Sequence, residues 1–235
     1  MLQVIKRCIP LAVKKKLARL CNELNDEYAI KSYSQEGEDM ILRRIFEGQS
    51  CGFFVDVGAH HPYRFSNTYF FYKRGWSGIN IEPNPDAISE FHSKRPRDIN
   101  LQMGVSDISG QLTYYQFDEP ALNTFDHEIV KSRLAETPYK LKATSEINIR
   151  RLDAILAEHL LKNTKIDFIS IDVEGFDFAV LKSNDWNLYR PKYVLVEMLN
   201  ASLEDAMRGE IYQFMKNHKY VLFAKTYNTL FFLSE

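Results

Sequence analysis

The sequence lacks the patterns of secreted, membrane-spanning and zinc-binding proteins. Its three cysteines, Cys8, Cys21 and Cys51, show no C-x-x-C spacing, which indicates a reducing compartment and neither a disulfide framework nor a zinc site. No apolar run approaches the ~20 residues that a membrane span needs. The first residues also lack the continuous apolar core and cleavage site of a secretory signal. We therefore expect a cytoplasmic protein.

The chain also has almost no net charge. Lys and Arg number 30 against 31 Asp and Glu, which gives −1 at pH 7. A broadly basic surface for binding nucleic acid is therefore not expected. Hydrophobic residues make up 45% of the 235 residues, so a sizeable core can form, and the length favours one large domain or one domain plus an arm.

Residues 1–31 differ in composition from the rest. Lysines and arginines stand among leucines and isoleucines there, and the spacing of Leu17, Leu20, Cys21 and Leu24 predicts an amphipathic helix after Pro10. One interpretation is a basic arm that docks on the inner face of a membrane or on a partner such as a glycosyltransferase. The other is a helix packed on the main domain, which we predict over residues 32–235, with its lysines in water.

From residue 32 onward, short apolar strands alternate with helical patterns. Strands are predicted at 53–57, 78–82, 99–105, 166–172 and 193–198, and a hairpin between 220 and 233 closes the chain. This alternation predicts an α/β, Rossmann-like fold: a mostly parallel seven-stranded sheet with helices on both faces and a C-terminal antiparallel hairpin. Residues 118–144 break the rhythm, which indicates either a lid-like insertion or a surface insertion without a role.

Acidic residues follow three consecutive predicted strands: Asp56, Glu82 and Asp107. In open parallel sheets, ligands bind in the crevice outside the carboxyl ends of the strands. Carboxylates there can accept hydrogen bonds from ribose hydroxyls and from an adenine amino group. Glu82 follows Asp56 at a little more than the ~20 residues of the dinucleotide fingerprint, so it is the candidate for the ribose. The pattern predicts a nucleoside-cofactor site.

The turn after Asp56 does not suit a pyrophosphate. It reads Val57-Gly58-Ala59-His60-His61-Pro62, with a single glycine in place of G-x-G-x-x-G and a proline that interrupts any immediate helix. The chain also has no G-x-x-x-x-G-K-[ST] sequence, which excludes a P-loop kinase. A cofactor without phosphate, S-adenosylmethionine, therefore fits better than a dinucleotide. An NAD-dependent oxidoreductase of the same topology is the alternative.

Five short segments together resemble the FkbM-type S-adenosylmethionine-dependent methyltransferases. They are Ser34-Gln35-Glu36-Gly37-Glu38-Asp39, Phe54-Val55-Asp56-Val57-Gly58-Ala59-His60, Ser66-Asn67-Thr68, Asn80-Ile81-Glu82-Pro83 and Ile171-Asp172-Val173-Glu174-Gly175. The resemblance runs from about residue 32 to residue 200. It implies a class I methyltransferase fold, S-adenosylmethionine as cofactor, and O-methylation of a hydroxyl on a sugar, a glycan or a natural product, as in polysaccharide biosynthesis.

By position, the resemblance also implies roles for single residues. Asp56 and Gly58 would line the methionine end of the cofactor, Glu82 would hold the ribose, and Asp107 would approach the adenine. The pocket would be closed by Gln35, Asp39 and Asn67. Asp177 departs from the family, in which a glutamate is expected. The turn His60-His61-Pro62 and residues 118–144 are where the choice of acceptor would differ.

Methyl transfer to an alcohol requires a group that takes the hydroxyl proton. Asp172, at the end of the predicted strand 166–172 and beside the cofactor, is the first candidate for this base, and Glu174 is the second. His60 or His61 on the opposite turn could serve instead, since histidine titrates near neutrality. No D/N-P-P-Y/F sequence, the amine-methylating motif of nucleic-acid enzymes, follows this strand.

Two other interpretations of these acids remain. Asp172, Glu174 and Glu197 could form a carboxylate site for Mg²⁺, although we assign no metal to the chain. The domain could also be a non-catalytic scaffold. The intact set of acids at Asp56, Glu82 and Asp172 favours an enzyme.

Overall fold

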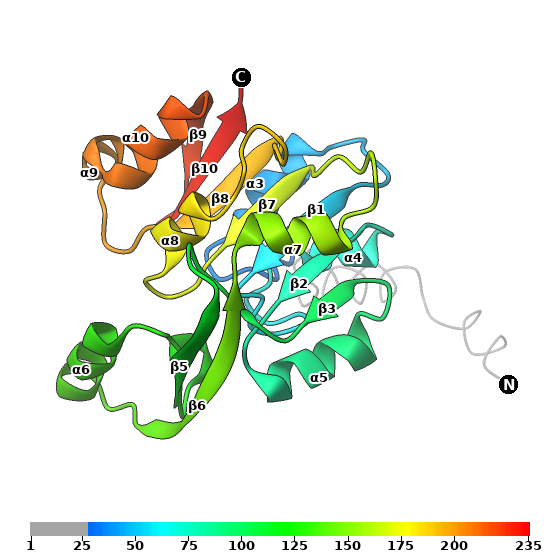
Figure 1. Cartoon of the computed structure of the whole chain (residues 1–235). Coiled ribbons are helices and arrows are strands. Elements are labelled where there is room, and N and C mark those ends of the chain that lie inside the picture. The colour runs from blue at the N-terminus through cyan, green and yellow to red at the C-terminus, as the bar shows by residue number, and fades with distance from the viewer. Residues whose placement is uncertain (1–27) are drawn as a thin grey trace, which may run out of the picture. The chain divides into compact units, whose positions relative to one another are not determined.

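The centre of the protein is a seven-stranded sheet with the strand order β3-β2-β1-β7-β8-β10-β9 (Figure 1). The computed structural model describes residues 28–235, so the amphipathic helix predicted after Pro10 lies outside the described residues. Ser32–Glu235 forms one compact unit. The strands of the sheet are β1 (Phe53–Val57), β2 (Ser77–Ile81), β3 (Ile99–Leu101), β7 (Phe168–Ile171), β8 (Tyr193–Glu197), β9 (Tyr220–Lys225) and β10 (Thr229–Ser234).

The first five of these strands pair in parallel, while β10 runs antiparallel to β8 and forms a hairpin with β9. The predicted α/β fold, with a mostly parallel seven-stranded sheet and a C-terminal antiparallel hairpin, is confirmed. The apolar runs of the central strands follow from this arrangement, because a parallel sheet is covered by helices on both faces.

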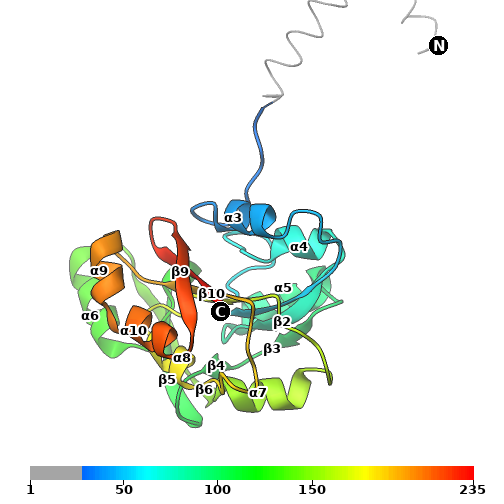
Figure 2. The same ribbon diagram turned by 90° about the horizontal axis from the view of Figure 1, so that it is seen from above.

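Alternation along each strand sends side chains to two separate cores. Val55 and Val57 of β1 join a core with helices α7 (Leu152–His159), α8 (Asp177–Lys182), α9 (Leu203–Arg208) and α10 (Glu210–Asn217). Phe54 points the other way, into a largely aromatic core with α3 (Glu38–Ile45) and α4 (Tyr69–Lys73). Figure 2 shows α3 and α4 on one side of the sheet and α7 on the other. Helix α5 (Pro85–Lys94) connects β2 to β3.

The strand order reverses between β1 and β7. The chain builds β2 and β3 outward on one side of β1 and then returns to place β7 and β8 on the other side. A crevice opens at such a switch point, outside the carboxyl ends of the strands. Strand pairing continues just beyond these ends, since Asp172 N–H donates to Val57 O and Gly58 N–H donates to Ile81 O, each at 3.0 Å.

A second, three-stranded sheet has the order β4-β6-β5. It consists of β4 (Gly104–Val105), β5 (Gly110–Phe117) and β6 (Leu141–Arg150), with a 3₁₀ turn (Pro120–Leu122) and helix α6 (His127–Glu136) between β5 and β6. We call residues 110–150 the β5–β6 excursion. The predicted strand 99–105 is therefore wrong as one element, because β3 ends at Leu101 and β4 belongs to the other sheet. Residues 118–144 contain the 3₁₀ turn and α6, which connect β5 to β6, and the first residues of β6.

Candidate functional site

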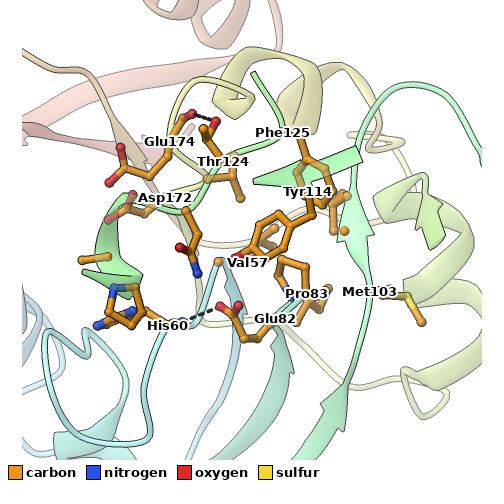
Figure 3. Close-up of a pocket in the computed structure, with 18 of the residues that line it drawn as sticks. Val57, His60, Glu82, Pro83, Met103, Tyr114, Thr124, Phe125, Asp172 and Glu174 are labelled. Carbon is orange, nitrogen blue, oxygen red and sulfur yellow. Dashed lines mark hydrogen bonds between the residues drawn. The ribbon is translucent and has the colours of Figure 1, made fainter. Parts of the chain in front are cut away.

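A cavity of about 750 Å³, measured with its open mouth, lies at the carboxyl ends of β1, β2 and β7. Figure 3 shows that side chains from these strand ends and from the β5–β6 excursion converge on it. The predicted site residues that line the cavity are Gln35, Gly58, His60, Glu82, Asp172 and Glu174. The structure thus brings together the ends of three strands that are far apart in the sequence.

Gly58 makes the close contact between the β1 turn and the end of β7. Its φ is +80°, and a Cβ built on it would lie 1.8 Å from the backbone oxygen of Asp172. Glycine adopts positive φ without steric cost, and here it also leaves space for the neighbouring backbone. The absence of a side chain at Gly58 therefore lets the β1 turn pack directly against the backbone of Asp172.

Glu82 follows β2 and is buried in the cavity wall. Its two carboxylate oxygens accept hydrogen bonds from the N–H groups of His60 and Asn84, each at 2.8 Å. Burial raises the pKa of Glu82 to about 7, against the effect of these donors, and the nearby Asp56 adds to the rise. A carboxylate held in this way can accept further hydrogen bonds from a ligand.

The two histidines of the turn occupy different environments. His60 lines the cavity, and its ring stacks on Phe65 with 6.0 Å between the centroids. Burial, helped by the Arg64 guanidinium, lowers the pKa of His60 to about 4, so its imidazole is neutral. His61 lies outside the cavity lining, since its Nδ1 accepts from Tyr63 and Arg64 N–H groups within its own loop. His61 supports the turn and does not face the cavity.

Three carboxylates, including that of Asp172, lie close together at the end of β7. Asp172, Glu174 and Glu197 each offer an oxygen, and these oxygens lie within 4.8 Å of one another. Asp172 is open to the cavities, but its enclosure by protein atoms and the adjacent Glu174 raise its pKa well above the ordinary value, and burial together with Asp172 does the same for Glu197. The repulsion between these neighbouring carboxylates disfavours their joint ionisation.

Glu174 is instead held by the β5–β6 excursion. Its carboxylate forms an ion pair with Arg133 of α6, and its backbone oxygen accepts from Thr124 Oγ1 at 2.8 Å. Glu174 has φ +52°, a left-handed conformation that surrounding contacts must stabilise. Asp177 adds two of these contacts by accepting from the N–H groups of Val173 and Gly175. Asp177, whose departure from the family pattern left its role open, thus caps the turn after β7.

Asp56 does not line the cavity. Its side chain points to the face of the sheet that α3 and α4 cover, where it accepts from Thr68 Oγ1 at 2.6 Å. Burial raises the pKa of Asp56, and the same Thr68 oxygen accepts from the fully buried Arg95 at 2.9 Å. The structure places Asp56 in a buried polar network under the β1 turn.

Asp39 and Asp107 also lie away from the cavity. Asp39 accepts from Ser32 Oγ at 2.5 Å and pairs with Arg43, which fixes the segment that leads into α3. Asp107 pairs with Lys182 of α8 at 2.7 Å and is partly exposed. Met103 and Val105, which come shortly before Asp107 in the chain, line the cavity instead.

Asn67 lines a second cavity of about 310 Å³, which shares Gln35, Phe65 and Asp172 with the first. Asn67 Nδ2 donates to Ser170 Oγ at 3.0 Å. The remaining lining is acidic or polar: Glu36, Glu38, Glu197, Asn228 and Thr229. The two cavities thus meet at Asp172.

Several lining residues are not among the predicted site residues, although Asn123, Thr124 and Phe125 fall within residues 118–144, where the choice of acceptor was expected to differ. Met103 and Gly104 lie at the start of the second sheet, and the excursion supplies Tyr114, Asn123, Thr124 and Phe125. Gly104 is the sequence feature that indicates the contact between β4 and the excursion, because a Cβ built on it would lie 2.7 Å from the Phe125 ring. A glycine inside a strand marks such a close approach, although the sequence does not name the partner.

Comparisons with known proteins lead to methyltransferases. The model of the methyltransferase FkbM domain family matches residues 56–222. Among solved structures, a methyltransferase from Geobacter sulfurreducens is 14% identical, with 99% of this chain and 94% of that chain covered and a TM-score of 0.43. A TehB-like SAM-dependent methyltransferase from Corynebacterium glutamicum ATCC 13032 Kitasato is 9% identical, with 96% and 100% covered and a TM-score of 0.41.

The search of curated proteins found no match. Within residues 28–235, no helix has the length and apolar character to cross a membrane. Since the family match extends over most of the chain and includes the strand ends that form the cavity, the protein belongs to the FkbM methyltransferase family.

Proposed function

We propose that the protein is an S-adenosylmethionine-dependent O-methyltransferase that acts on a hydroxyl of a sugar, a glycan or a natural product. Membership of the FkbM family supports methyl transfer. The observation that carries the choice of cofactor is the cavity at the β1/β7 switch point, which combines the Gly58 turn, the buried Glu82 and an apolar wall.

The residues of the cavity fit each part of this cofactor. Glu82 can accept from ribose hydroxyls, and the apolar wall suits an adenine: Ile81, Pro83, Met103, Val105 and Phe125. Asp172, when ionised, can attract the positive sulfonium and ammonium groups of the cofactor. Among the described residues, no Lys or Arg lines the cavity, which disfavours the pyrophosphate of NAD.

When bound, the cofactor supplies a methyl group that is activated for displacement by an attacking oxygen. The chain must align an acceptor hydroxyl and take its proton. Asp172 is exposed to both cavities, and its raised pKa makes it a stronger base than an ordinary aspartate. His60 is the weaker candidate because its pKa is lowered to about 4. The Glu174 carboxylate already forms an ion pair with Arg133, which makes it a weaker candidate for the base.

Binding of the cofactor product is the first test. S-adenosylhomocysteine, titrated into the full chain by calorimetry, is expected to bind, whereas NAD is not, since the β1 turn has one glycine and the cavity lining among the described residues has no cationic side chain. Tight binding of NAD with none of S-adenosylhomocysteine would instead support an oxidoreductase. Absence of both, with folding intact, would favour a scaffold.

The acceptor is proposed to enter through the smaller cavity next to Asp172. Carboxylates and amides there can receive the hydroxyl donors of a saccharide. A panel of sugars, glycans and hydroxylated natural products should be incubated with methyl-labelled S-adenosylmethionine. Label in a hydroxyl-bearing product supports the proposal, and label confined to amines would contradict it. Recruitment to a membrane or a glycosyltransferase through residues 1–31 stays a prediction from the sequence.

Chelation tests the alternative metal site. Methyl transfer is expected to persist after dialysis against a chelator, because Arg133 already pairs with Glu174 and the raised pKa values of Asp172 and Glu197 disfavour the fully ionised cluster that a cation would bind. The rate should be measured before and after, with Mg²⁺ added back. A loss of activity that Mg²⁺ restores would assign these carboxylates to a metal.

A further inference from the structure

Tyr114 links the β5–β6 excursion to the end of β2. It belongs to β5 in the second sheet, yet Figure 3 shows it in the cavity wall with its hydroxyl directed toward Glu82. The side chain is 4% exposed, and its ring packs on Phe125 with 4.8 Å between the centroids. Few rotations are open to a ring held in this way, so the position of its hydroxyl is fixed.

The direction of the hydrogen bonds around Tyr114 follows from its neighbours. Asn123 Oδ1 accepts from the Phe117 N–H at 2.8 Å, so the Asn123 amide turns its NH₂ group toward the Tyr114 oxygen. With its oxygen facing this donor, the Tyr114 hydroxyl is left to donate toward the Glu82 carboxylate, and the two groups shift each other's pKa. The excursion thus contributes two polar side chains, with Asn123 oriented toward Tyr114 and Tyr114 oriented toward Glu82.

Glu82 accepts two hydrogen bonds from the backbone, from the N–H groups of His60 and Asn84. Tyr114 adds a side-chain hydroxyl that is directed toward the same carboxylate. A carboxylate has about four acceptor sites, which leaves capacity for ribose hydroxyls. The direction in which the free acceptor sites of Glu82 point depends on the Tyr114 hydroxyl as well as on the two backbone donors.

We propose that Tyr114 is a positioning residue for ribose recognition: its hydroxyl orients the Glu82 carboxylate, so that the β5–β6 excursion sets cofactor affinity together with the strand ends. This inference rests on the proposed function, because it takes Glu82 as the group that binds the ribose. It differs from a role in packing, since the ring alone would be enough for the contact with Phe125.

The proposal predicts a change in how the affinity for the cofactor depends on pH. The titratable groups around Glu82 are Asp56 at the end of β1, whose charge raises the pKa of Glu82 from the other face of the sheet, and Tyr114, while the His60 imidazole lines the same cavity. The pKa of Glu82 lies near 7, and the Tyr114 hydroxyl lowers it by stabilising the ionised form. Ionised Glu82 is the better acceptor for ribose hydroxyls, so affinity falls as the pH drops through this pKa. Without the hydroxyl, that fall begins at a higher pH.

The test uses the full chain and S-adenosylhomocysteine, titrated by calorimetry across the neutral pH range. Tyr114→Phe keeps the ring and removes the donor, so we expect affinity at neutral pH to fall about tenfold, with the acid limb displaced to higher pH. The matched control is Tyr115→Phe, the next residue on the opposite face of β5, whose ring contacts His127 outside the cavity. It should retain wild-type affinity and pH profile.

A double-mutant cycle with Glu82→Gln separates positioning from packing. If Tyr114 acts through Glu82, Tyr114→Phe should cause little further loss in the Glu82→Gln background. An equal loss in both backgrounds would overturn the proposal, as would a wild-type pH profile in Tyr114→Phe, and either result would leave the proposed cofactor intact. Failure of the wild-type chain to bind S-adenosylhomocysteine would overturn the proposed function and this inference together.

Discussion

Replacing Asp172 by Asn is expected to lower the rate of methyl transfer by ~10²-fold or more while changing the affinity for S-adenosylhomocysteine much less. Asparagine keeps the size and hydrogen-bonding reach of the side chain but cannot take a proton. Asp172 is the carboxylate on which both cavities converge, and its pKa is raised by burial and by Glu174. Turnover should be measured with an acceptor found in the labelled-methyl screen, and affinity by calorimetry.

The wild-type rate should also rise with pH, because a base must be deprotonated and the raised pKa of Asp172 lets it hold its proton to a higher pH than an ordinary aspartate. Asp172→Asn should lose this limb of the profile. Asp107→Asn is the matched control: Asp107 also follows a predicted strand but pairs with Lys182 away from the cavity. Unchanged turnover in Asp172→Asn would exclude Asp172 as the base.

The fold could be predicted because its signals are local. Short apolar segments that end in an acid or a glycine predict the strands of the parallel sheet. Because the carboxyl ends of parallel strands lie at the same edge, Gly58, Glu82 and Asp172 come together there. Position along a strand does not, however, tell which face a side chain takes. Asp56 stands next to Val57 at the end of β1, but alternation turns it away from the cavity toward Thr68.

The second sheet could not be predicted, because it depends on a pairing between distant segments. Residues 99–105 have the composition of one continuous strand, and only the pairing of Gly104 with Ile149 takes β4 out of the main sheet. The roles of Tyr114 and Arg133 follow from that pairing. Neither residue belongs to a recognisable motif, and the sequence does not show that the elements that carry them, β5 and α6, reach the strand ends of the main sheet.

The segment Ser34 to Asp39, which carries part of the family resemblance, lines the smaller cavity and also contacts the last hairpin. Glu36 accepts from Asn228 N–H at 2.7 Å and Glu38 accepts from Thr226 Oγ1 at 2.9 Å, both in the β9–β10 turn. Buried charged groups need such partners, and these two attach the start of the domain to its last hairpin. Gln35 is the member of this segment that faces both cavities.

Gly58→Ala is expected to destabilise the protein by ~3 kcal/mol or more and to weaken S-adenosylhomocysteine binding in whatever protein still folds. A left-handed conformation alone costs a residue with a Cβ about 1–2 kcal/mol. At Gly58 the new Cβ would also lie 1.8 Å from Asp172 O, and since that atom is backbone, the turn after β7 must move. Thermal unfolding should show a midpoint lower by roughly 10 °C.

Gly48→Ala provides the matched control for this change. Gly48 has φ +85°, close to the +80° of Gly58, but a Cβ there would meet nothing within 4 Å. It should therefore show only the backbone cost, about 1–2 kcal/mol, with binding of S-adenosylhomocysteine unchanged. Equal losses in the two variants would mean that the contact between the β1 turn and Asp172 adds nothing. A larger loss at Gly58 would show that the single glycine of the turn is required because it lets two strand ends approach closely enough to form one site.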